Sequence, residues 1–337
     1  MAAGGNMSTM NPHHLIGFGP NANCTLALCP VEWSVLQYRP SLIASGAFVE
    51  LFGFAMLLHI AQGVQLRSWG FSAAMVLGCV DEIVGYGGRI KLNDDPFSYV
   101  GFFIQIICIT TGPVFFCAAI YVTLSRTIVH LDPTLARFPP SLLYWVFVPC
   151  DIISLVLQAA GGGTSTTAAV ATNSAAASNS GLGMSLAGLL MQVITLAAFA
   201  ILAGDYLVRY ARAPDSPYMS RRVKVFLVCM WLAIVFILVR CAYRIAELHG
   251  GYTGPLFHEE GKFYVLESTM VVLAVFCMNL GHPGYALRRE PLPQIGSVAH
   301  NWDANEFGHV VKEKAGHFEE IEEPAESGEP SAWSPVV

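Results

Sequence analysis

Seven long apolar segments alternate with shorter polar segments along this chain of 337 residues. A transmembrane helix needs about 20 mostly apolar residues. The segments that meet this requirement are 41–61, 70–90, 98–125, 141–161, 183–207, 223–245 and 263–281. The second is interrupted by Asp81, Glu82 and Arg89. The pattern predicts an all-α, polytopic membrane protein with seven transmembrane helices.

The polar segments between these helices carry residues that end helices. Prolines stand in "LDPTLARFPP" (131–140) and in "ARAPDSPYMSRR" (211–222), and proline cannot continue a helical hydrogen-bond ladder. Residues 161–181 are small, polar and uncharged. This composition is typical of flexible linkers, so we expect a loop here and regard it as a candidate for O-glycosylation.

The composition supports membrane integration. Hydrophobic residues make up 54% of the chain and charged residues 12%, whereas soluble proteins carry about 25% charged residues. We expect an extracellular N-terminal segment (1–40), a seven-helix transmembrane domain (41–287) and an acidic, disordered cytoplasmic tail (288–337). No basic patch with interleaved aromatic residues is present in the sequence, which argues against a nucleic-acid partner.

Charge bias predicts that the N-terminus lies outside and the C-terminus in the cytoplasm. In this orientation ten Lys and Arg residues flank the cytoplasmic helix ends (67, 126, 137, 209, 212, 221, 222, 224, 288 and 289), and five flank the external ends (39, 89, 91, 244 and 262). This distribution follows the positive-inside rule. Asn6 and Asn23 lie in glycosylation sequons that are usable on the lumenal side. Cys24 and Cys29 could form a disulfide there.

Two of the predicted helices carry matching stripes of polar residues. Glu82, Tyr86 and Arg89 are spaced four and three residues apart, so they share one helix face. Residues 240, 244 and 247 have the same spacing but the opposite order of charge. If the two parallel helices are neighbours, two ion pairs form in register. These pairs are Glu82 with Arg240, and Arg89 with Glu247.

Further polar side chains occur at comparable depth on the other predicted helices, namely Glu50, Gln105, Asp151, Gln158, Gln192 and Glu267. A charged group at the middle of a bilayer helix costs roughly 2.5–3.5 kcal/mol. The pattern therefore favours a polar cavity between the helices, open toward the outer leaflet. The alternative is that these groups only hold the bundle together by hydrogen bonds and ion pairs.

Several sequence motifs resemble those of one known family. The "E-x-x-G-Y-x-x-R" of Glu82, Gly85, Tyr86 and Arg89 resembles the second-helix signature of the fungal lipid-translocating exporter family. Its founding members are linked to 7-aminocholesterol resistance and to release of sphingoid long-chain bases. Other similar motifs follow in order: "GPVFFCAAIY" (112–121), "DIISLVLQAAGGG" (151–163), "GLLMQV" (188–193), "RCAYRIAELHGG" (240–251) and "HPG" (282–284). Departures are the long loop after "GGG" and the lone glutamate in "LEST" (266–269).

The resemblance covers roughly residues 45–287 and implies export or transbilayer movement of amphipathic lipids. The cargo would be sphingoid long-chain bases or phospholipid- or sterol-like amphiphiles, with resistance to toxic amphiphiles as a result. The expected location is the plasma membrane, with endomembranes also open, and the oligomeric state is open. The candidate site residues are Glu82, Tyr86, Arg89, Gln105, Tyr121, Asp151, Gln158, Gln192, Arg240, Arg244, Glu247 and Glu267. Pro113, His282 and Pro283 are expected to be structural.

A receptor and an enzyme are the two alternative classes of function. A seven-helix lipid-sensing receptor or regulator of lipid asymmetry fits the helix count equally well, but its third cytoplasmic loop (about 208–222) would be short. An intramembrane zinc enzyme needs about three metal ligands, and only His59 and His282 lie near membrane depth, both expected at the cytoplasmic interface. We therefore expect no enzymatic activity, metal or cofactor. No "GxxxxGK[ST]" loop for ATP is present in the sequence.

Overall fold

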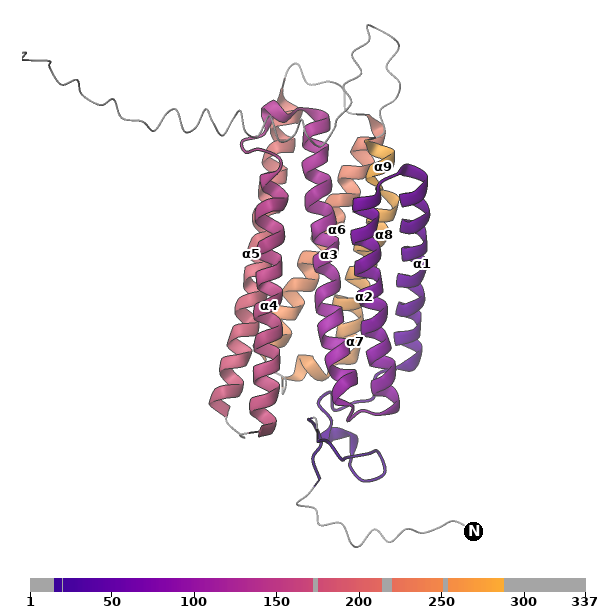
Figure 1. Cartoon of the computed structure of the whole chain (residues 1–337), viewed down its shortest axis with the longest axis vertical. Helices are drawn as coiled ribbons and strands as arrows, with labels where there is room; N and C mark the ends of the chain where they lie inside the picture. The colour runs from indigo at the N-terminus through magenta and orange to yellow at the C-terminus, as the bar shows by residue number, and fades with distance from the viewer. Residues whose placement is uncertain (1–14, 20, 172–174, 214–219, 251–253, 288–337) are drawn as a thin grey trace, which may run out of the picture. The chain divides into compact units, whose positions relative to one another are not determined.

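The computed structural model describes residues 15–19, 21–171, 175–213, 220–250 and 254–287, without the side chains of 166–179 and 255. Every regular element in these ranges is helical (Figure 1). The long helices are α1 (Leu42–Leu66), α2 (Trp69–Asp94), α3 (Tyr99–Leu131), α4 (Leu142–Ala171), α5 (Ala175–Arg212), α6 (Arg221–His249) and α8 (Met270–Leu280). The short elements are η2 (Val31–Trp33), η3 (Pro133–Leu135), η4 (Pro255–His258), α7 (Glu260–Phe263), η5 (Tyr264–Thr269) and α9 (Pro283–Ala286).

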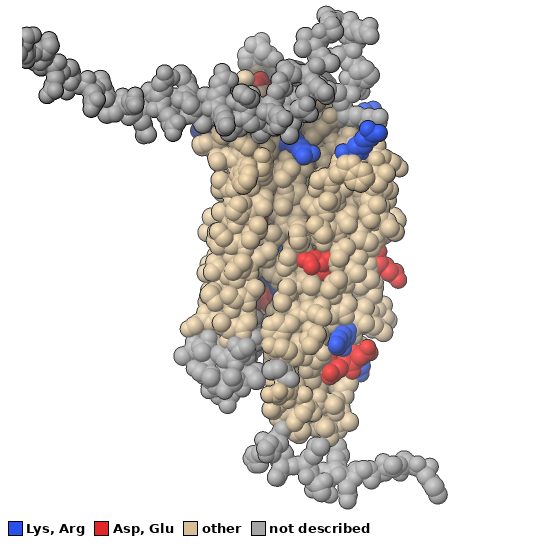
Figure 2. Space-filling model, in the orientation of Figure 1, with Lys and Arg blue, Asp and Glu red and all other residues tan. Residues whose placement is uncertain are grey.

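Each of the seven predicted spans coincides with helical structure, and the chain is an integral membrane protein. Six helical segments in the described part are long and apolar enough to cross a bilayer. α2 is the seventh long helix and carries more charge. Figure 2 shows the broad band of uncharged side chains, with most of the visible Lys and Arg toward its ends.

Neighbouring helices in the chain pack side by side and close into a ring. α1 packs on α2, α2 on α3, and so on to α6, which packs on α8, while α8 also contacts α1. α6 packs on α5, α8 and α3 rather than along α2. The predicted neighbourhood of the second and sixth helices is therefore wrong, and the two stripes do not face each other directly.

The predicted loop at 161–181 is also wrong, because α4 and α5 continue through most of it. The small residues in this segment let α4 and α5 pack closely on each other. A methyl group on Gly161 would lie 2.5 Å from the Gly181 carbonyl oxygen, and one on Gly188 would lie 2.6 Å from the Ser154 carbonyl oxygen. Small residues let transmembrane helices approach to backbone contact. In a membrane protein this composition therefore indicates a helix interface as readily as a loop.

The last span is broken by a π-helical turn. η5 lies between α7 and α8, and the Thr269 hydroxyl donates to the Tyr264 carbonyl oxygen five residues earlier at 2.8 Å. π-Helical turns insert one extra residue and are frequent at functional sites. The turn holds the fully buried Glu267. α8 then ends at Leu280, and Pro283 begins α9.

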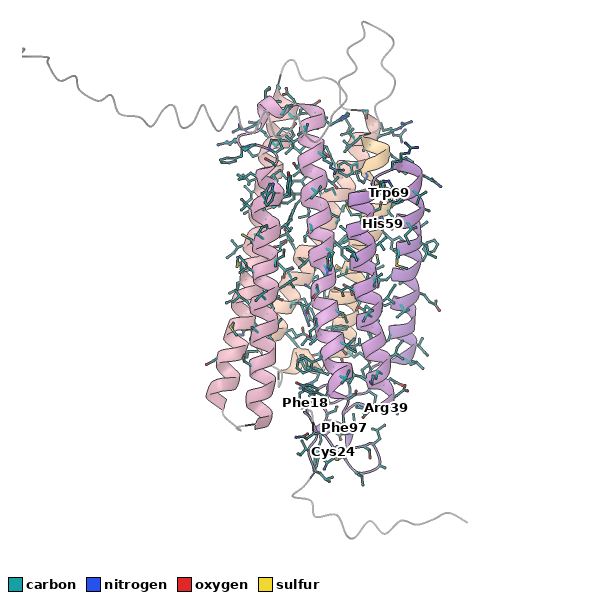
Figure 3. The ribbon with its side chains drawn as sticks, viewed as in Figure 1. Phe18, Cys24, Arg39, His59, Trp69 and Phe97 are labelled. Carbon is teal, nitrogen blue, oxygen red and sulfur yellow. A yellow bond between two sulfur atoms is a disulfide. The ribbon has the colours of Figure 1, made fainter. Side chains whose placement is uncertain are left out.

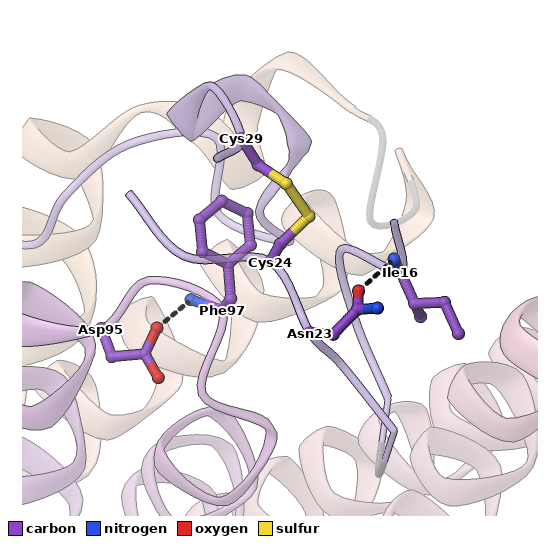
Figure 4. The surroundings of a disulfide bond; sticks show 6 residues. All are labelled: Ile16, Asn23, Cys24, Cys29, Asp95 and Phe97. Atoms are coloured by element: carbon purple, nitrogen blue, oxygen red, sulfur yellow. Dashed lines mark hydrogen bonds between the residues drawn. A yellow bond between two sulfur atoms is a disulfide. The ribbon is translucent and has the colours of Figure 1, made fainter. Parts of the chain in front are cut away.

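The residues just before α1 form a cap against the α2–α3 turn. Figure 3 shows Phe18, Cys24, Arg39 and Phe97 at one end of the structure, away from His59 and Trp69. Cys24 and Cys29 are joined by a disulfide next to Phe97 (Figure 4). Arg39 donates to the Asn93 carbonyl oxygen at 2.7 and 3.0 Å.

The structure describes one of the two predicted glycosylation sites and both histidines of the first and last spans. Asn23 is exposed, and its side-chain oxygen accepts from the Ile16 amide at 2.7 Å. Asn6 and the acidic tail lie outside the described residues. The His282 Nδ1 accepts from the Gly284 amide at 3.1 Å and so caps α9. His59, expected near the cytoplasmic end of the first helix, is fully buried beside Phe71.

Candidate functional site

A cavity of about 100 Å³ lies between α3, α4, α5 and α6. Its walls are mostly apolar and aromatic, with Phe102 and Ile106 from α3, Leu155 from α4 and Leu189 from α5. The polar side chains on the wall are Thr110, Thr111, Gln158, Ser185, Arg244 and Glu247. The cavity is therefore apolar along most of its surface and charged on one side.

The charged side of the cavity is an ion pair within α6. The Arg244 Nη1 lies 2.6 Å from the Glu247 Oε2, and the two side chains are 12% and 6% exposed. Arg244 also donates to the Thr110 hydroxyl at 3.0 Å, which connects α6 to α3. A charge-assisted hydrogen bond in such a partly buried place is stronger than one in water. The pair is thus held in position at the cavity surface.

A second ion pair lies directly behind the first. Arg240 of α6 donates from Nε to the Glu267 Oε1 at 2.9 Å, and both side chains are 0% exposed. The Nε of Arg244 lies 3.6 Å from the same Glu267 oxygen. Glu267 therefore links the two arginines into one network.

Pro113 explains how the bundle accommodates the fully buried Arg240 side chain. A helical carbonyl normally accepts from the amide four residues later, and proline has no amide hydrogen. The carbonyl of Ile109 is four residues before Pro113, so the helix leaves it free. Arg240 donates to that oxygen at 3.0 Å. The proline thus has a structural role, which is to supply α3 with an acceptor for the buried guanidinium.

Both ion pairs predicted from the stripes are wrong. Arg89 of α2 lies 3.4 Å from Glu260 and donates to the Tyr38 hydroxyl at 3.1 Å. Glu247 is occupied by Arg244 of its own helix. In the part of the chain that the structure describes, Glu82 makes no ion pair, and Arg240 binds Glu267 instead. The physical reason is that α3 and η5 line α6 where α2 was expected.

Arg89 is nevertheless close to the charged wall. It lines a smaller cavity of about 10 Å³ together with Tyr38, Gln105, Arg244 and Glu247. Its guanidinium stacks over the Phe263 ring at 4.2 Å, a cation–π contact. Burial raises the pKa of the Tyr38 phenol, so the hydroxyl that Arg89 contacts stays protonated.

The remaining candidates lie in contacts between helices, and all but Gln158 are outside the cavity. Tyr121 donates to the Asp151 Oδ2 at 2.9 Å between α3 and α4. Gln158 donates to the Gln192 Oε1 at 3.3 Å between α4 and α5, and only Gln158 of this pair lines the cavity. Tyr86 stacks on Phe48, 5.2 Å between ring centroids. These contacts fit the alternative interpretation, in which polar groups hold the bundle together.

Comparison with known proteins identifies the family. A family model described as "RTA1 like protein" matches residues 75–290. The chain belongs to the RTA1-like family. The resemblance drawn from the motifs is thereby confirmed. No solved structure matches the chain.

Three curated relatives align with more than half of this RTA1-like protein. "Sphingoid long-chain base transporter RSB1" of Saccharomyces cerevisiae is 26% identical over 320 residues, covering 84% of this chain and 80% of the relative. "Protein RTM1" of Saccharomyces cerevisiae is 29% identical, covering 63% and 67%. "Lipid-translocating exporter-like protein RTA1" of Leptosphaeria maculans is 25% identical, covering 76% and 52%.

Sequence reasoning missed several residues of the RTA1-like site. Glu260, Tyr38 and Thr110 all contact site arginines. Thr110 is a polar residue inside the apolar segment 98–125, but its spacing of five residues from Gln105 puts it on a different helix face. Glu260 and Tyr38 lie outside the apolar segments. Polar residues are common there, so their presence does not indicate a functional site. Glu50, predicted to join the polar layer, is exposed on α1.

Within the described ranges no group of three or more His, Cys, Asp and Glu side chains could hold a metal ion. His59 and His282 lie close together, 6.3 Å between ring centroids. The wall of the cavity offers charge, hydrogen-bonding groups and apolar contact.

Proposed function

We propose that this protein moves amphipathic lipids across the membrane, with the cavity between α3 and α6 as the binding site for the head group. The observation that carries the proposal is the Arg244–Glu247 ion pair on the wall of an otherwise apolar cavity. Glu247 suits an ammonium group and Arg244 suits a phosphate or carboxylate. The acyl chain would lie along the aromatic and aliphatic wall or in the surrounding lipid.

The names of the relatives support a lipid cargo. One is named a sphingoid long-chain base transporter and another a lipid-translocating exporter-like protein. We propose the same broad class for this chain: sphingoid long-chain bases or phospholipid- or sterol-like amphiphiles. Export of such molecules from a fungal plasma membrane would give resistance to toxic amphiphiles.

Translocation is tested with purified protein in lipid vesicles and a fluorescent sphingoid base. Wild-type protein is expected to raise the transbilayer rate above that of protein-free vesicles. Glu247→Gln is expected to lower the rate at least about tenfold, because it removes one charge-assisted contact with the head group, worth about 1.5–3 kcal/mol. The rate is measured by quenching of the label in the outer leaflet.

The matched control is Arg137→Gln. This variant also breaks an ion pair, that of Arg137 with Asp205 at 2.9 Å, but the arginine is 57% exposed and outside the cavity. We expect its rate to equal that of the wild type. A wild-type rate no higher than in protein-free vesicles would contradict direct translocation. That result would favour the alternative of a lipid-sensing receptor or regulator.

We also propose that the N-terminus faces the cell exterior and the C-terminus the cytoplasm. Endoglycosidase treatment is then expected to increase the gel mobility of the wild-type protein. The shift should disappear when Ser8→Ala and Thr25→Ala remove both sequons, while Asn23 keeps its contact with the Ile16 amide. Thr25→Ser is the control, since it preserves the second sequon. Identical mobility of treated and untreated wild-type protein would count against this orientation.

A further inference from the structure

The buried network contains more acid than base. Arg240 and Arg244 are surrounded by the carboxyl groups of Glu82, Glu247 and Glu267. Two cations cannot balance three anions, so one carboxyl has no counter-charge when all five groups are ionised. An ionised carboxylate without a partner costs several kcal/mol in such a place. One of the three acids therefore carries a proton or recruits a cation.

Glu82 is the carboxyl without a partner. It makes no ion pair among the described residues, its side chain is 1% exposed, and its Oε1 has no hydrogen-bond partner. Arg240 uses Nε and Nη2 for Glu267 and Ile109, while its Nη1 has no hydrogen-bond partner. A free acceptor and a free donor are thus buried in the same network.

The backbone of α3 leaves space for this carboxyl. A methyl group on Gly112 would lie 2.7 Å from the Glu82 Oε1, so the carboxyl rests against bare backbone. The titratable groups that face Glu82 come from every element around it. They are Cys79, Asp81 and Tyr86 of α2, Cys108 of α3, Arg240 and Arg244 of α6, and Glu267 of η5.

We infer that Glu82 is an exchangeable proton site whose state decides where Arg240 binds. With the proton on, Glu82 is neutral and Arg240 binds Glu267, as in this structure. When the O–H bond breaks, the proton passes to water and the Glu82 carboxylate accepts a hydrogen bond from the Arg240 Nη1. Glu267 is then left to Arg244. Uptake of a proton reverses the exchange.

The exchange reaches the cavity through a continuous series of contacts. Arg240 lies 2.8 Å from Glu267, Glu267 lies 3.6 Å from Arg244, and Arg244 lies 2.6 Å from Glu247 on the cavity wall. A shift of Arg240 toward Glu82 draws Arg244 toward Glu267 and away from Glu247. Glu247 would then be free for a cationic head group. Only this last step, the binding of a cationic head group by Glu247, rests on the proposed function.

The proton site itself is tested without cargo. Infrared difference spectra of the full-length protein in lipid nanodiscs are recorded between about pH 5 and about pH 8, the range in which a coupled site would titrate. The spectra are recorded in an Asp151→Asn background, which removes a separate buried carboxyl. We expect a protonated-carboxyl stretching band that weakens as the pH rises in this background and is lost when Glu82→Gln is added. A band that is insensitive to pH, or unchanged in Glu82→Gln, overturns the proton site.

Coupling to translocation is tested separately in the vesicle assay. The wild-type rate is expected to respond to an imposed pH difference, and the rate of Glu82→Gln is expected to lose that response. Equal wild-type rates with and without the pH difference would overturn the coupling. Absence of any wild-type translocation would overturn the proposed function and leave the infrared result to decide the proton site. Glu82→Gln mimics the protonated acid in shape, and a monodisperse elution profile verifies its fold.

Discussion

Replacing Arg240 by glutamine is expected to be the most destabilising single change in this protein. The substitution leaves Glu267 buried without its cation and the Ile109 carbonyl without its donor. Breaking a buried ion pair from one side costs about 3–5 kcal/mol. That is a large part of the stability of a typical folded domain. We expect a strongly reduced yield and a much lower unfolding temperature.

The measurement is thermal unfolding of detergent-solubilised protein, followed by a dye that reacts with newly exposed thiols. Cys117 and Cys241 are both 0% exposed and therefore react only after unfolding. Adding Glu267→Gln should restore part of the loss, because the double variant buries no unpaired charge at this pair. Arg137→Gln, at the exposed pair, should unfold like the wild type. A full sum of the two single losses in the double variant would refute the coupling of Arg240 with Glu267.

Adding one methyl group to Gly161 is expected to separate α4 from α5. In Gly161→Ala the new carbon would lie 2.5 Å from the carbonyl oxygen of Gly181, and backbone atoms in a helix cannot move aside independently. Forced overpacking costs typically 1–3 kcal/mol, and we expect about 3 kcal/mol at this backbone contact. The same thiol assay would report this as a lower unfolding temperature.

The control lies two residues further along the same helix. A methyl group on Gly163 meets no atom within 4 Å, so Gly163→Ala should leave the unfolding temperature unchanged or raise it slightly. The comparison can be repeated on α5, where Gly181 is crowded and Gly183 is open. Equal behaviour of the crowded and open glycines would show that the two helices do not pack by backbone contact.

The positions of the helices could be predicted from the sequence, because apolar length is a direct requirement of the bilayer. Polar residues inside the spans were expected to face other helices, and Glu82, Arg240 and Glu267 are indeed buried. Their partners did not follow, because a stripe defines a face of a helix and not the helix that it meets. The spacing of Glu82 and Arg89 on α2 matched that of Arg240 and Glu247 on α6, although these residues do not pair. The structure instead places α3 and η5 beside α6.

Two further details could not be predicted from the periodicity of a regular α-helix. The π-helical turn adds a residue before Glu267, which changes the face on which that carboxyl stands. Pro113 frees the Ile109 carbonyl, a consequence that appears only when a donor on another helix is known. The segment 161–181 was misread because small polar residues serve both loops and close helix contacts.

The polar character of α2 has a consequence for how the protein is made. A translocon accepts a segment by its own free energy of partitioning, and each Asp or Arg at mid-depth opposes entry by about 2.5–3.5 kcal/mol. α2 carries Asp81, Glu82 and Arg89, and a methyl group on Gly85 or Gly88 of the same helix would collide with α3. It is therefore expected to wait at the channel until α3 has emerged from the ribosome, and the two to enter the bilayer as a pair.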